Sequence, residues 1–214
     1  MKWSEGSVAP AAFLSLVVLL VPATARGQVA FEYFRGTAFN VPTTLTVTQA
    51  GYPPIQFTAH YDVRPLTDRG YYAYRLELWK DRQAWIVELV HHKLYLENPQ
   101  GEVEEFEVTH GYNLITLNRG WRRGHNTLLF GGGVVLAYPH STIRGHRWPT
   151  DAGYYLSGVT IQGAAGRRFD LSTRIFASVE GKLTASWARV PVVDGHATVP
   201  NGAFHVLAGL GVQF

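Results

Sequence analysis

The 214-residue chain contains no cysteine, a single methionine and few charged residues, 16% in all. The absence of cysteine excludes disulfides and cysteine-ligated metal sites. Beyond residue 21 no apolar stretch is long enough for a transmembrane helix, which needs about 20 residues, since Gly, Arg or Glu interrupts each one. If the chain crosses a membrane, it does so with strands.

What the chain has in quantity is aromatic residues, 13%, together with 22 glycines. This mixture is unusual for a soluble enzyme, but it suits many strands that need aromatic anchors and close backbone approach. The composition therefore favours an all-β protein. The formal charge of +3 comes from scattered basic residues, so we expect no nucleic acid as a partner and an anionic membrane surface instead.

The first residues have the order of a secretory signal peptide. Lys2 precedes the apolar run AAFLSLVVLLV at 11–21, and small residues follow at Ala23 and Ala25. We expect cleavage after Ala25, which excludes residues 1–25 from the fold. Residues 26–54 are predicted to be an N-terminal segment, periplasmic or packed, because TTLTVTQ at 43–49 could be a strand but would make the strand number odd.

Residues 55–214 show repeated two-residue alternation, which is the period of a strand. The final stretch GAFHVLAGLGVQF places Phe204, Val206, Leu210, Val212 and Phe214 on one face. Eight strands are expected, with short turns alternating with longer loops. The expected strands are 55–64, 70–79, 83–97, 104–121, 127–139, 153–166, 174–190 and 202–214.

Apolar residues outward, polar residues inward and an even strand number are the requirements of a transmembrane barrel. Aromatic residues ten apart on one face, Trp85 with Tyr95 and Phe204 with Phe214, match an apolar band about 25 Å high. We therefore predict an all-β fold, an eight-stranded antiparallel transmembrane β-barrel with periplasmic short turns and extracellular long loops.

On these features the chain resembles the small eight-stranded outer-membrane proteins of Gram-negative bacteria, the OmpA-type and OmpX-type barrels. The resemblance implies location in the outer membrane, with its lipids and lipopolysaccharide as partners. The terminal strand FHVLAGLGVQF is similar to the C-terminal signal that the assembly machinery reads in this class. The resemblance says little about activity. It covers residues 55–214 and leaves the oligomeric state open.

Eight strands enclose only enough space for side chains to fill, so no open channel is expected. Charges of both signs on the inward faces are predicted to form a network of mutual salt bridges, since an unpaired charge there would be costly. The members of this lumen network are His60, Asp62, Arg64, Arg75, Glu77, Glu88, Glu180, Lys182 and His205.

Three residues break the outward apolar rule near the extracellular loops: His91 and Lys93 on one strand and His110 on the next. In one reading they contact lipid headgroups, with Lys93 and His91 meeting lipopolysaccharide. In the other, His91 or His110 is a catalytic base for acyl hydrolysis or transfer on lipid A, with Tyr112 or Asn113 holding the oxyanion. The pairing of the two strands stays open, because NPQG fits two turn types that differ by one residue in register.

The enzyme reading has only a weak resemblance to lipid A deacylase barrels, because their His-x-Ser pair is absent. No metal site and no cofactor are predicted. A third alternative is a surface adhesion or ligand-binding barrel acting through the loop HSTIRGHRWPTDAG. The sequence thus predicts an integral envelope protein that contacts lipopolysaccharide, with lipid A modification and adhesion as alternatives.

Overall fold

The computed structural model describes residues 27–66, 70–149 and 153–214, and these residues form strands, turns and loops. The expected signal peptide, 1–25, lies outside the described residues. Strands β1 to β13 form one antiparallel sheet. Their bounds are β1 Gln28–Val41, β2 Thr43–Gln49, β3 Ile55–Ala59, β4 Tyr61–Asp62, β5 Tyr72–Lys80, β6 Gln83–Leu96, β7 Val103–Arg123, β8 Asn126–Ala137, β9 His140–Ile143, β10 His146–Arg147, β11 Tyr155–Asp170, β12 Ile175–Val192 and β13 Gly195–Gln213.

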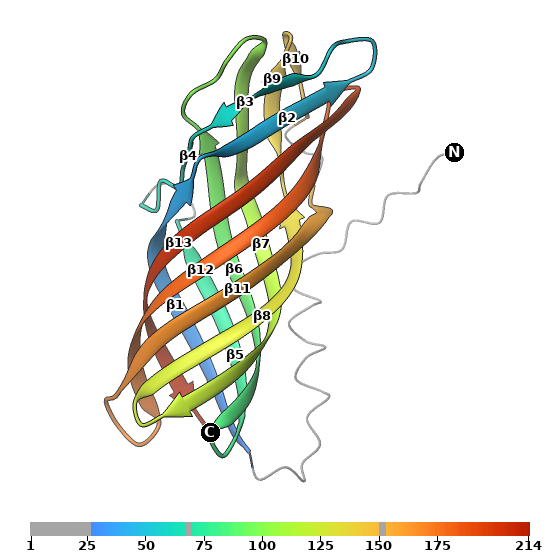
Figure 1. Ribbon diagram of the computed structural model, residues 1–214. Helices are drawn as coiled ribbons and strands as arrows, with labels where there is room; N and C mark the ends of the chain where they lie inside the picture. Colours follow the sequence, from blue (N-terminus) through green and yellow to red (C-terminus); the bar gives the residue numbers. More distant parts are fainter. Residues whose placement is uncertain (1–26, 67–69, 150–152) are drawn as a thin grey trace.

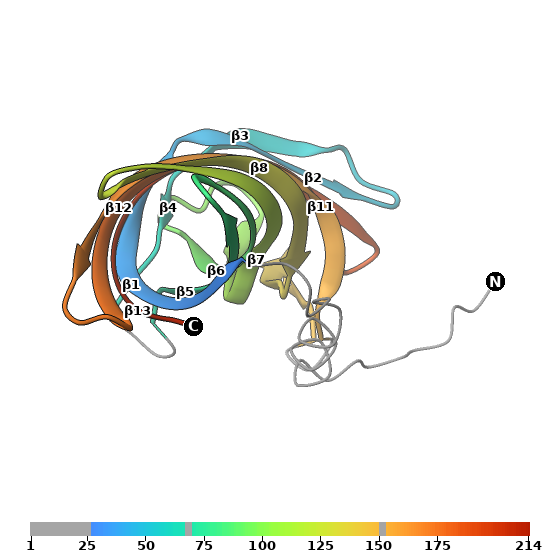
Figure 2. The ribbon, with the colours of Figure 1, turned by 90° about the horizontal axis from the view of Figure 1, so that it is seen from below.

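Eight of these strands close into a ring, as predicted. In order around the barrel they are β1, β5, β6, β7, β8, β11, β12 and β13, and β13 pairs back with β1. Figure 1 shows the strands tilted around a tall barrel, and Figure 2 shows the ring from below. No helix among the described residues is long and apolar enough to cross a membrane.

The first strand of the ring differs from the expectation. β1 lies inside residues 26–54 and pairs with both β13 and β5. The segment 55–64 instead forms β3 and β4, which belong to the upper part of the molecule, with β3 paired to β2. The alternation of 55–64 is as regular as that of β1, because the strands in the upper part of the molecule also have one buried face. Alternation alone therefore does not distinguish a strand of the ring from a strand above it.

The stagger of the ring follows from its pairing register. A line from Ala30 across successive partners visits the other seven strands and returns to β1 at Asn40, ten residues further on. Ten residues at about 3.3 Å, against eight strands about 4.8 Å apart, give a strand tilt of about 40°. This tilt lies in the range of membrane barrels.

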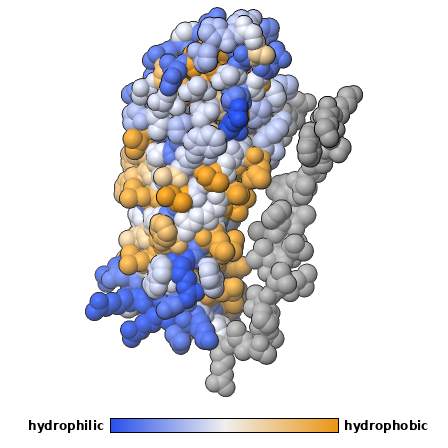
Figure 3. Space-filling view, turned by 45° about the vertical axis from the view of Figure 1, so that its right-hand side comes forward, coloured by the Kyte–Doolittle hydropathy of each residue, from blue (hydrophilic) through white to orange (hydrophobic). Residues whose placement is uncertain are grey.

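The outward face of the ring carries a belt of exposed apolar side chains. Figure 3 shows it across the lower half of the molecule, above a hydrophilic foot and below a more polar upper part. Trp85 and Trp121 lie near its lower edge, and Phe39 and Trp187 near its upper edge, each more than two-fifths exposed. The short turns 81–82, 124–125 and 171–174 lie at the foot together with the C-terminus (Figure 1), and in outer-membrane barrels the short turns face the periplasm.

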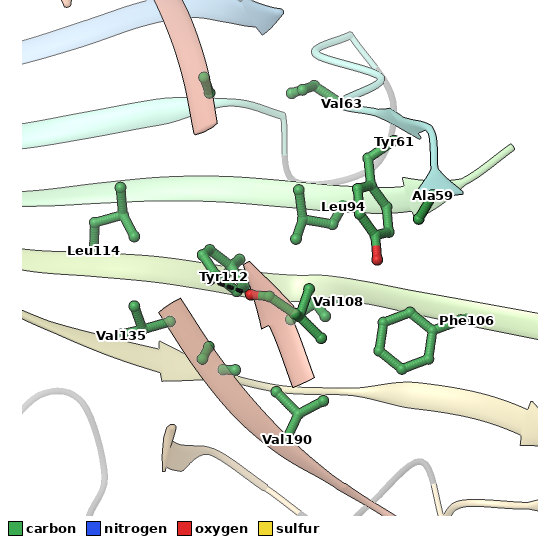
Figure 4. Packing of buried hydrophobic residues seen from close by; sticks show 14 of the residues in the cluster. Ala59, Tyr61, Val63, Leu94, Phe106, Val108, Tyr112, Leu114, Val135 and Val190 are labelled. Atoms are coloured by element: carbon green, nitrogen blue, oxygen red, sulfur yellow. Dashed lines mark hydrogen bonds between the residues drawn. The ribbon is translucent and has the colours of Figure 1, made fainter. Parts of the chain in front are cut away.

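Above the belt the sheet continues, with β2, β3, β4, β9 and β10 added to it (Figure 1). The interior of this upper part is apolar. Figure 4 shows Phe106, Val108, Leu94 and Val190 packed together, with the hydroxyl of Tyr112 among them. This packing closes the upper end of the barrel with side chains.

Candidate functional site

The lumen at belt height is filled by charged side chains that bind one another. Arg75 Nη2 donates to Glu88 Oε1 and to Glu180 Oε1, both at 2.7 Å. Lys182 Nζ donates to the second oxygen of Glu88. All four side chains are at most 5% exposed. β5, β6 and β12 position them, because each strand turns every second residue inward.

The lumen network continues toward the foot of the barrel. Arg168 Nη2 donates to Glu77 Oε2 at 2.7 Å, and Trp79 Nε1 donates to the same oxygen at 2.6 Å. Gln162 Nε2 donates to Glu88 Oε2 at 2.6 Å. Each of the buried cations Arg75, Arg168 and Lys182 lies against at least one buried carboxylate, so the charges neutralise each other. Such an arrangement fills the barrel and rigidifies it.

The structure brings six of the nine predicted lumen residues together inside the barrel: Arg75, Glu77, Glu88, Glu180, Lys182 and His205. His205 accepts or donates through both ring nitrogens, with Nδ1 2.6 Å from Tyr71 Oη and Nε2 2.9 Å from Thr184 Oγ1. The inward position that the alternation of the last strand predicted for His205 is the position found.

The other three predicted lumen residues lie elsewhere. His60 and Arg64 are exposed and Asp62 is partly exposed, because they follow β3 in the upper extension rather than a strand of the ring. Arg64 forms an ion pair with Asp62 at 3.6 Å and places its guanidinium 4.3 Å from the ring centre of Tyr95. These residues belong to the outer surface above the belt.

Two lumen residues were missed by the sequence analysis. Glu32 lies in β1, which was not assigned to the barrel, and it lies 3.7 Å from Arg75 and accepts from Ser178. Arg168 lies between the expected strands 153–166 and 174–190, but β11 extends to Asp170 and buries it. An acidic residue between apolar neighbours in AFEYF at 30–34 was the available signal for Glu32.

On the outward side of the barrel wall, polar side chains gather where the apolar belt ends, and four of them, His91, Lys93, Asn113 and His140, are at most 8% exposed. We call these residues the outer collar; they are Tyr72, His91, Lys93, His110, Asn113, Tyr138, His140 and Tyr154. In its first half, the rings of Tyr72 and His91 stack at 4.5 Å with an angle of 13° between planes. His91 Nδ1 lies 2.8 Å from Asn113 Oδ1. The three residues are direct neighbours across β5, β6 and β7.

The second half of the outer collar is a group of four rings. His110 Nδ1 lies 3.1 Å from His140 Nε2, so one imidazole donates to the other. Tyr138 packs against both histidines, with ring centres 4.8 Å and 5.2 Å away. Tyr154 meets Tyr138 edge to face at 5.2 Å, and its hydroxyl donates to the carbonyl of His110. Tyr154 is 45% exposed and offers this group to its surroundings.

A bulge in β7 separates the predicted catalytic residues. His92 pairs with Tyr112 and Leu94 pairs with Val108, so three residues of β7 stand opposite Lys93 alone. Gly111, with φ at 130°, is the residue that permits this path. His91 consequently faces Asn113 rather than His110, and the register differs from both that the sequence left open.

The same bulge reverses the faces of two residues. Tyr112 points into the upper lumen, where its hydroxyl donates to the carbonyl of Val199 at 3.0 Å (Figure 4). Asn113 points outward to His91. Tyr112 therefore lies away from the outer surface where a lipid substrate would be, while Asn113 faces outward but is only 6% exposed. By the alternation of β6 Lys93 points outward, but it is only 1% exposed, and its Nζ lies 6.0 Å from the ring centre of Tyr95.

Within the outer collar, Tyr154 is exposed beside the apolar belt, and Tyr72, His110 and Tyr138 are partly exposed. Burial and the neighbouring His110 hold the pKa of His140 below its ordinary value, so its imidazole stays neutral near pH 7. A neutral imidazole donates and accepts, as a tyrosine hydroxyl does. Such groups suit hydroxyls and amides of a sugar. Among the described residues, no cluster of three or more His, Asp or Glu side chains has the arrangement of a metal site.

Comparisons with known proteins place the fold. No protein-family model and no curated protein matches the chain. Among solved structures, the chain superposes on the outer membrane protein AlkL, determined in lipid bilayers, with a TM-score of 0.51 and 9% identity over 100% of this chain and 97% of that chain. Two weaker similarities are the attachment invasion locus protein Ail of Yersinia pestis and the outer membrane protease OmpT from Escherichia coli.

Ail has a TM-score of 0.40 and 13% identity over 89% of this chain and all of that one. OmpT has a TM-score of 0.46 and 12% identity, over 92% of this chain and 99% of that one. At these identities the similarity is one of fold. The closed eight-stranded ring, the apolar belt and the likeness to AlkL together make this chain an integral β-barrel protein of the bacterial outer membrane.

Proposed function

We propose that this outer-membrane barrel contacts lipopolysaccharide through the outer collar. The observation that carries the proposal is the position of these rings, on the outward face of β5 to β9 where the apolar belt ends. At that height a membrane changes from acyl chains to headgroups, and amphipathic rings are favoured there. The exposed Tyr154 and the partly exposed Tyr72, Tyr138 and His110 can bond the sugar hydroxyls, while the apolar belt below them contacts acyl chains.

Cations beside the outer collar support binding of the phosphate groups. Arg147, in β10, is exposed and lies close enough to His140 to lower its pKa. Arg64 lies over Tyr95 on the same side of the barrel. Guanidinium groups bind phosphate with two parallel hydrogen bonds. The collar thus combines sugar-bonding and phosphate-bonding groups within one surface.

The test measures lipopolysaccharide retained by the full-length exported protein after extraction in mild detergent from Gram-negative cells. We expect Arg64→Gln with Arg147→Gln to lower the retained amount about tenfold, the loss of two charge-assisted contacts. Arg189→Gln with His196→Gln is the control for an unrelated surface, because this hydrogen-bonded pair lies on β12 and β13, across the ring, and its loss removes one cation. Equal retention in both variants and the unchanged protein would exclude the collar as the contact surface.

The same cells separate binding from catalysis. The hydrogen-bonded His110 and His140 at the lipid surface form an oriented base, which is the feature that favours acyl hydrolysis or transfer on lipid A. Lipid A from cells overproducing the protein is expected to keep its mass. A change equal to one acyl chain, lost in His110→Ala, would replace the binding proposal by the enzyme. Binding to host surfaces by residues 140–153 with unchanged lipid A would favour adhesion.

Strand β13 supports a second partner, the outer-membrane assembly machinery. Its outward residues alternate from Phe204 to Val212, Phe214 follows them, and the strand closes the ring against β1. An exposed terminal aromatic residue is an accessible recognition group. We expect Phe214→Ala to lower the folded yield in cells, measured by heat-modifiable gel migration, while the same variant refolds normally in detergent. Normal yield in cells would exclude this role.

A further inference from the structure

The periplasmic end of the barrel carries a strong excess of positive charge. Residues 80–82, 119–126 and 167–174, which are all described, contain seven exposed or partly exposed cations and two acidic side chains at the surface. The cations are Lys80, Arg82, Arg119, Arg122, Arg123, Arg167 and Arg174, and the acids are Asp81 and Asp170. The extracellular end mixes the two signs, with Glu97, Glu102 and Glu104 beside its arginines. The asymmetry indicates an anionic partner at the periplasmic end.

One depression in this end has both polar and apolar walls. It lies between the β5–β6 turn and β7, and Leu78, Lys80, Asp81, Arg82, Gln83, Trp85 and Arg119 line it. Trp85 is 53% exposed and Leu78 is 37% exposed, and both belong to the lower edge of the apolar belt. The cations stand at the foot, so the depression joins the acyl-chain region to the aqueous side.

Arg119 is held in place for an incoming anion. Its Nη2 donates to Gln83 Oε1, and its guanidinium carbon lies 5.1 Å from the ring centre of Trp85. These two contacts fix the plane of the guanidinium at the wall, which lowers the entropy lost when it binds a ligand. Asp81 is the one acid of the lining and faces three cations, so the depression keeps a net positive charge.

We propose that this depression binds the headgroup of an anionic phospholipid in the periplasmic leaflet. The phosphate contacts Arg82 and Arg119, and an acyl chain lies against Trp85 and Leu78. A soluble anion would use the cations but not the apolar wall, and a neutral lipid would use the wall but not the cations. The ligand that uses both is amphiphilic and anionic. This site lies across the membrane from the outer collar and stands independently of it.

The test titrates the detergent-solubilised protein with phosphatidylglycerol, phosphatidylethanolamine or inorganic phosphate and counts bound molecules by native mass spectrometry. We expect phosphatidylglycerol to bind about tenfold more tightly than phosphatidylethanolamine. Arg82→Gln with Arg119→Gln should weaken it about tenfold, since each cation near a lipid surface contributes a several-fold factor. The control Arg167→Gln with Arg174→Gln removes equal charge at the β11–β12 turn, across the ring, and should change binding less than twofold.

Heat-modifiable gel migration confirms that each variant is folded. Equal weakening in the two double variants would overturn the proposal, because binding would then depend on the total positive charge of this end of the barrel rather than on the depression. Displacement of the lipid by millimolar inorganic phosphate would overturn it as well, since the site would then be one for a soluble anion. Equal binding of phosphatidylethanolamine would also overturn the proposal, since the site would then not require a lipid with net negative charge.

Discussion

Glu88 is the carboxylate on which the lumen network converges. One of its oxygens accepts from Arg75 and the other accepts from Lys182 and Gln162. Since Glu88 is fully buried, its negative charge is stabilised only by these three donors. Removing the charge leaves two buried cations with fewer partners, which costs far more than the net gain of forming the pair.

We therefore expect Glu88→Gln to lower the free energy of unfolding by about 3 kcal/mol or more. Urea unfolding in lipid vesicles, followed by tryptophan fluorescence, measures the change. Glu104→Gln, at an exposed site of the upper hairpin, is the control and should change stability by less than about 0.5 kcal/mol. Adding Lys182→Met to Glu88→Gln should recover part of the loss, and a further loss would contradict the coupling.

His140 gives the outer collar a defined pH dependence. Its pKa is below the ordinary value of 6.5 in the folded protein, because of burial and the neighbouring His110. As pH falls through about 6.5, the unfolded chain therefore binds the proton first, and acid lowers stability. Between pH 8 and 5 the unchanged protein should lose more stability than His140→Gln, measured by the same urea unfolding. Identical slopes would exclude this contribution.

The candidate site was only partly predictable from single residues. His91, Lys93 and His110 could be selected because they are polar residues in an outward row that is otherwise apolar. Their partners could not, since the pairing depends on where Gly111 bulges, and that choice depends on how Tyr112 packs in the upper core. His140 lies in β9 and Tyr154 directly precedes β11, and neither carries a signal that joins it to His110.

At the scale of elements, β8 shows what its three consecutive glycines do. A Cβ added at Gly133 would overlap the carbonyl oxygen of Ile115, and one at Gly131 would overlap that of Leu117. At these two positions β7 approaches β8 so closely that a residue with a Cβ atom would clash with the backbone of β7. The glycines permit the sharp curvature that a ring of only eight strands needs.

Gly133→Ala should consequently lower the free energy of unfolding by about 1 to 3 kcal/mol, the cost of overpacking. Gly163→Ala on β11 is the matched control, because its added Cβ would meet Phe130 at an ordinary 3.7 Å. Unfolding in urea distinguishes the two variants. If Gly133→Ala were as stable as Gly163→Ala, close strand approach would not be the reason for glycine in β8.

The strand pattern was predictable for seven elements of the ring because each carries one apolar and one polar or small face. It failed for β1, since the strand considered within residues 26–54 was TTLTVTQ at 43–49, and the odd strand number argued against it. That segment is β2, which together with β3, β4, β9 and β10 extends the sheet above the belt and does not enter the ring. Counting strands presumes that every strand spans the membrane, and here some do not.

At the scale of the whole molecule, the lumen is filled in layers. Trp79 and Ile86 pack near the foot, the charged network around Arg75 fills the middle, and the apolar core around Tyr112 closes the top. We expect the protein in planar bilayers to show no discrete conductance steps. Reproducible ohmic steps from purified folded protein would contradict a filled lumen. The double variant Arg75→Gly with Glu88→Gly, which opens the middle layer, tests the sensitivity of the assay.

The length of β7 determines how far the molecule reaches from the cell. Its 21 residues rise about 50 Å at the tilt of the ring, and the apolar band accounts for about half of that. The turn at 97–102 is therefore held on a stiff stalk well clear of the lipid surface. An antibody epitope inserted between Pro99 and Gly101 should be reached on living cells, even where surface sugars shield the outer collar.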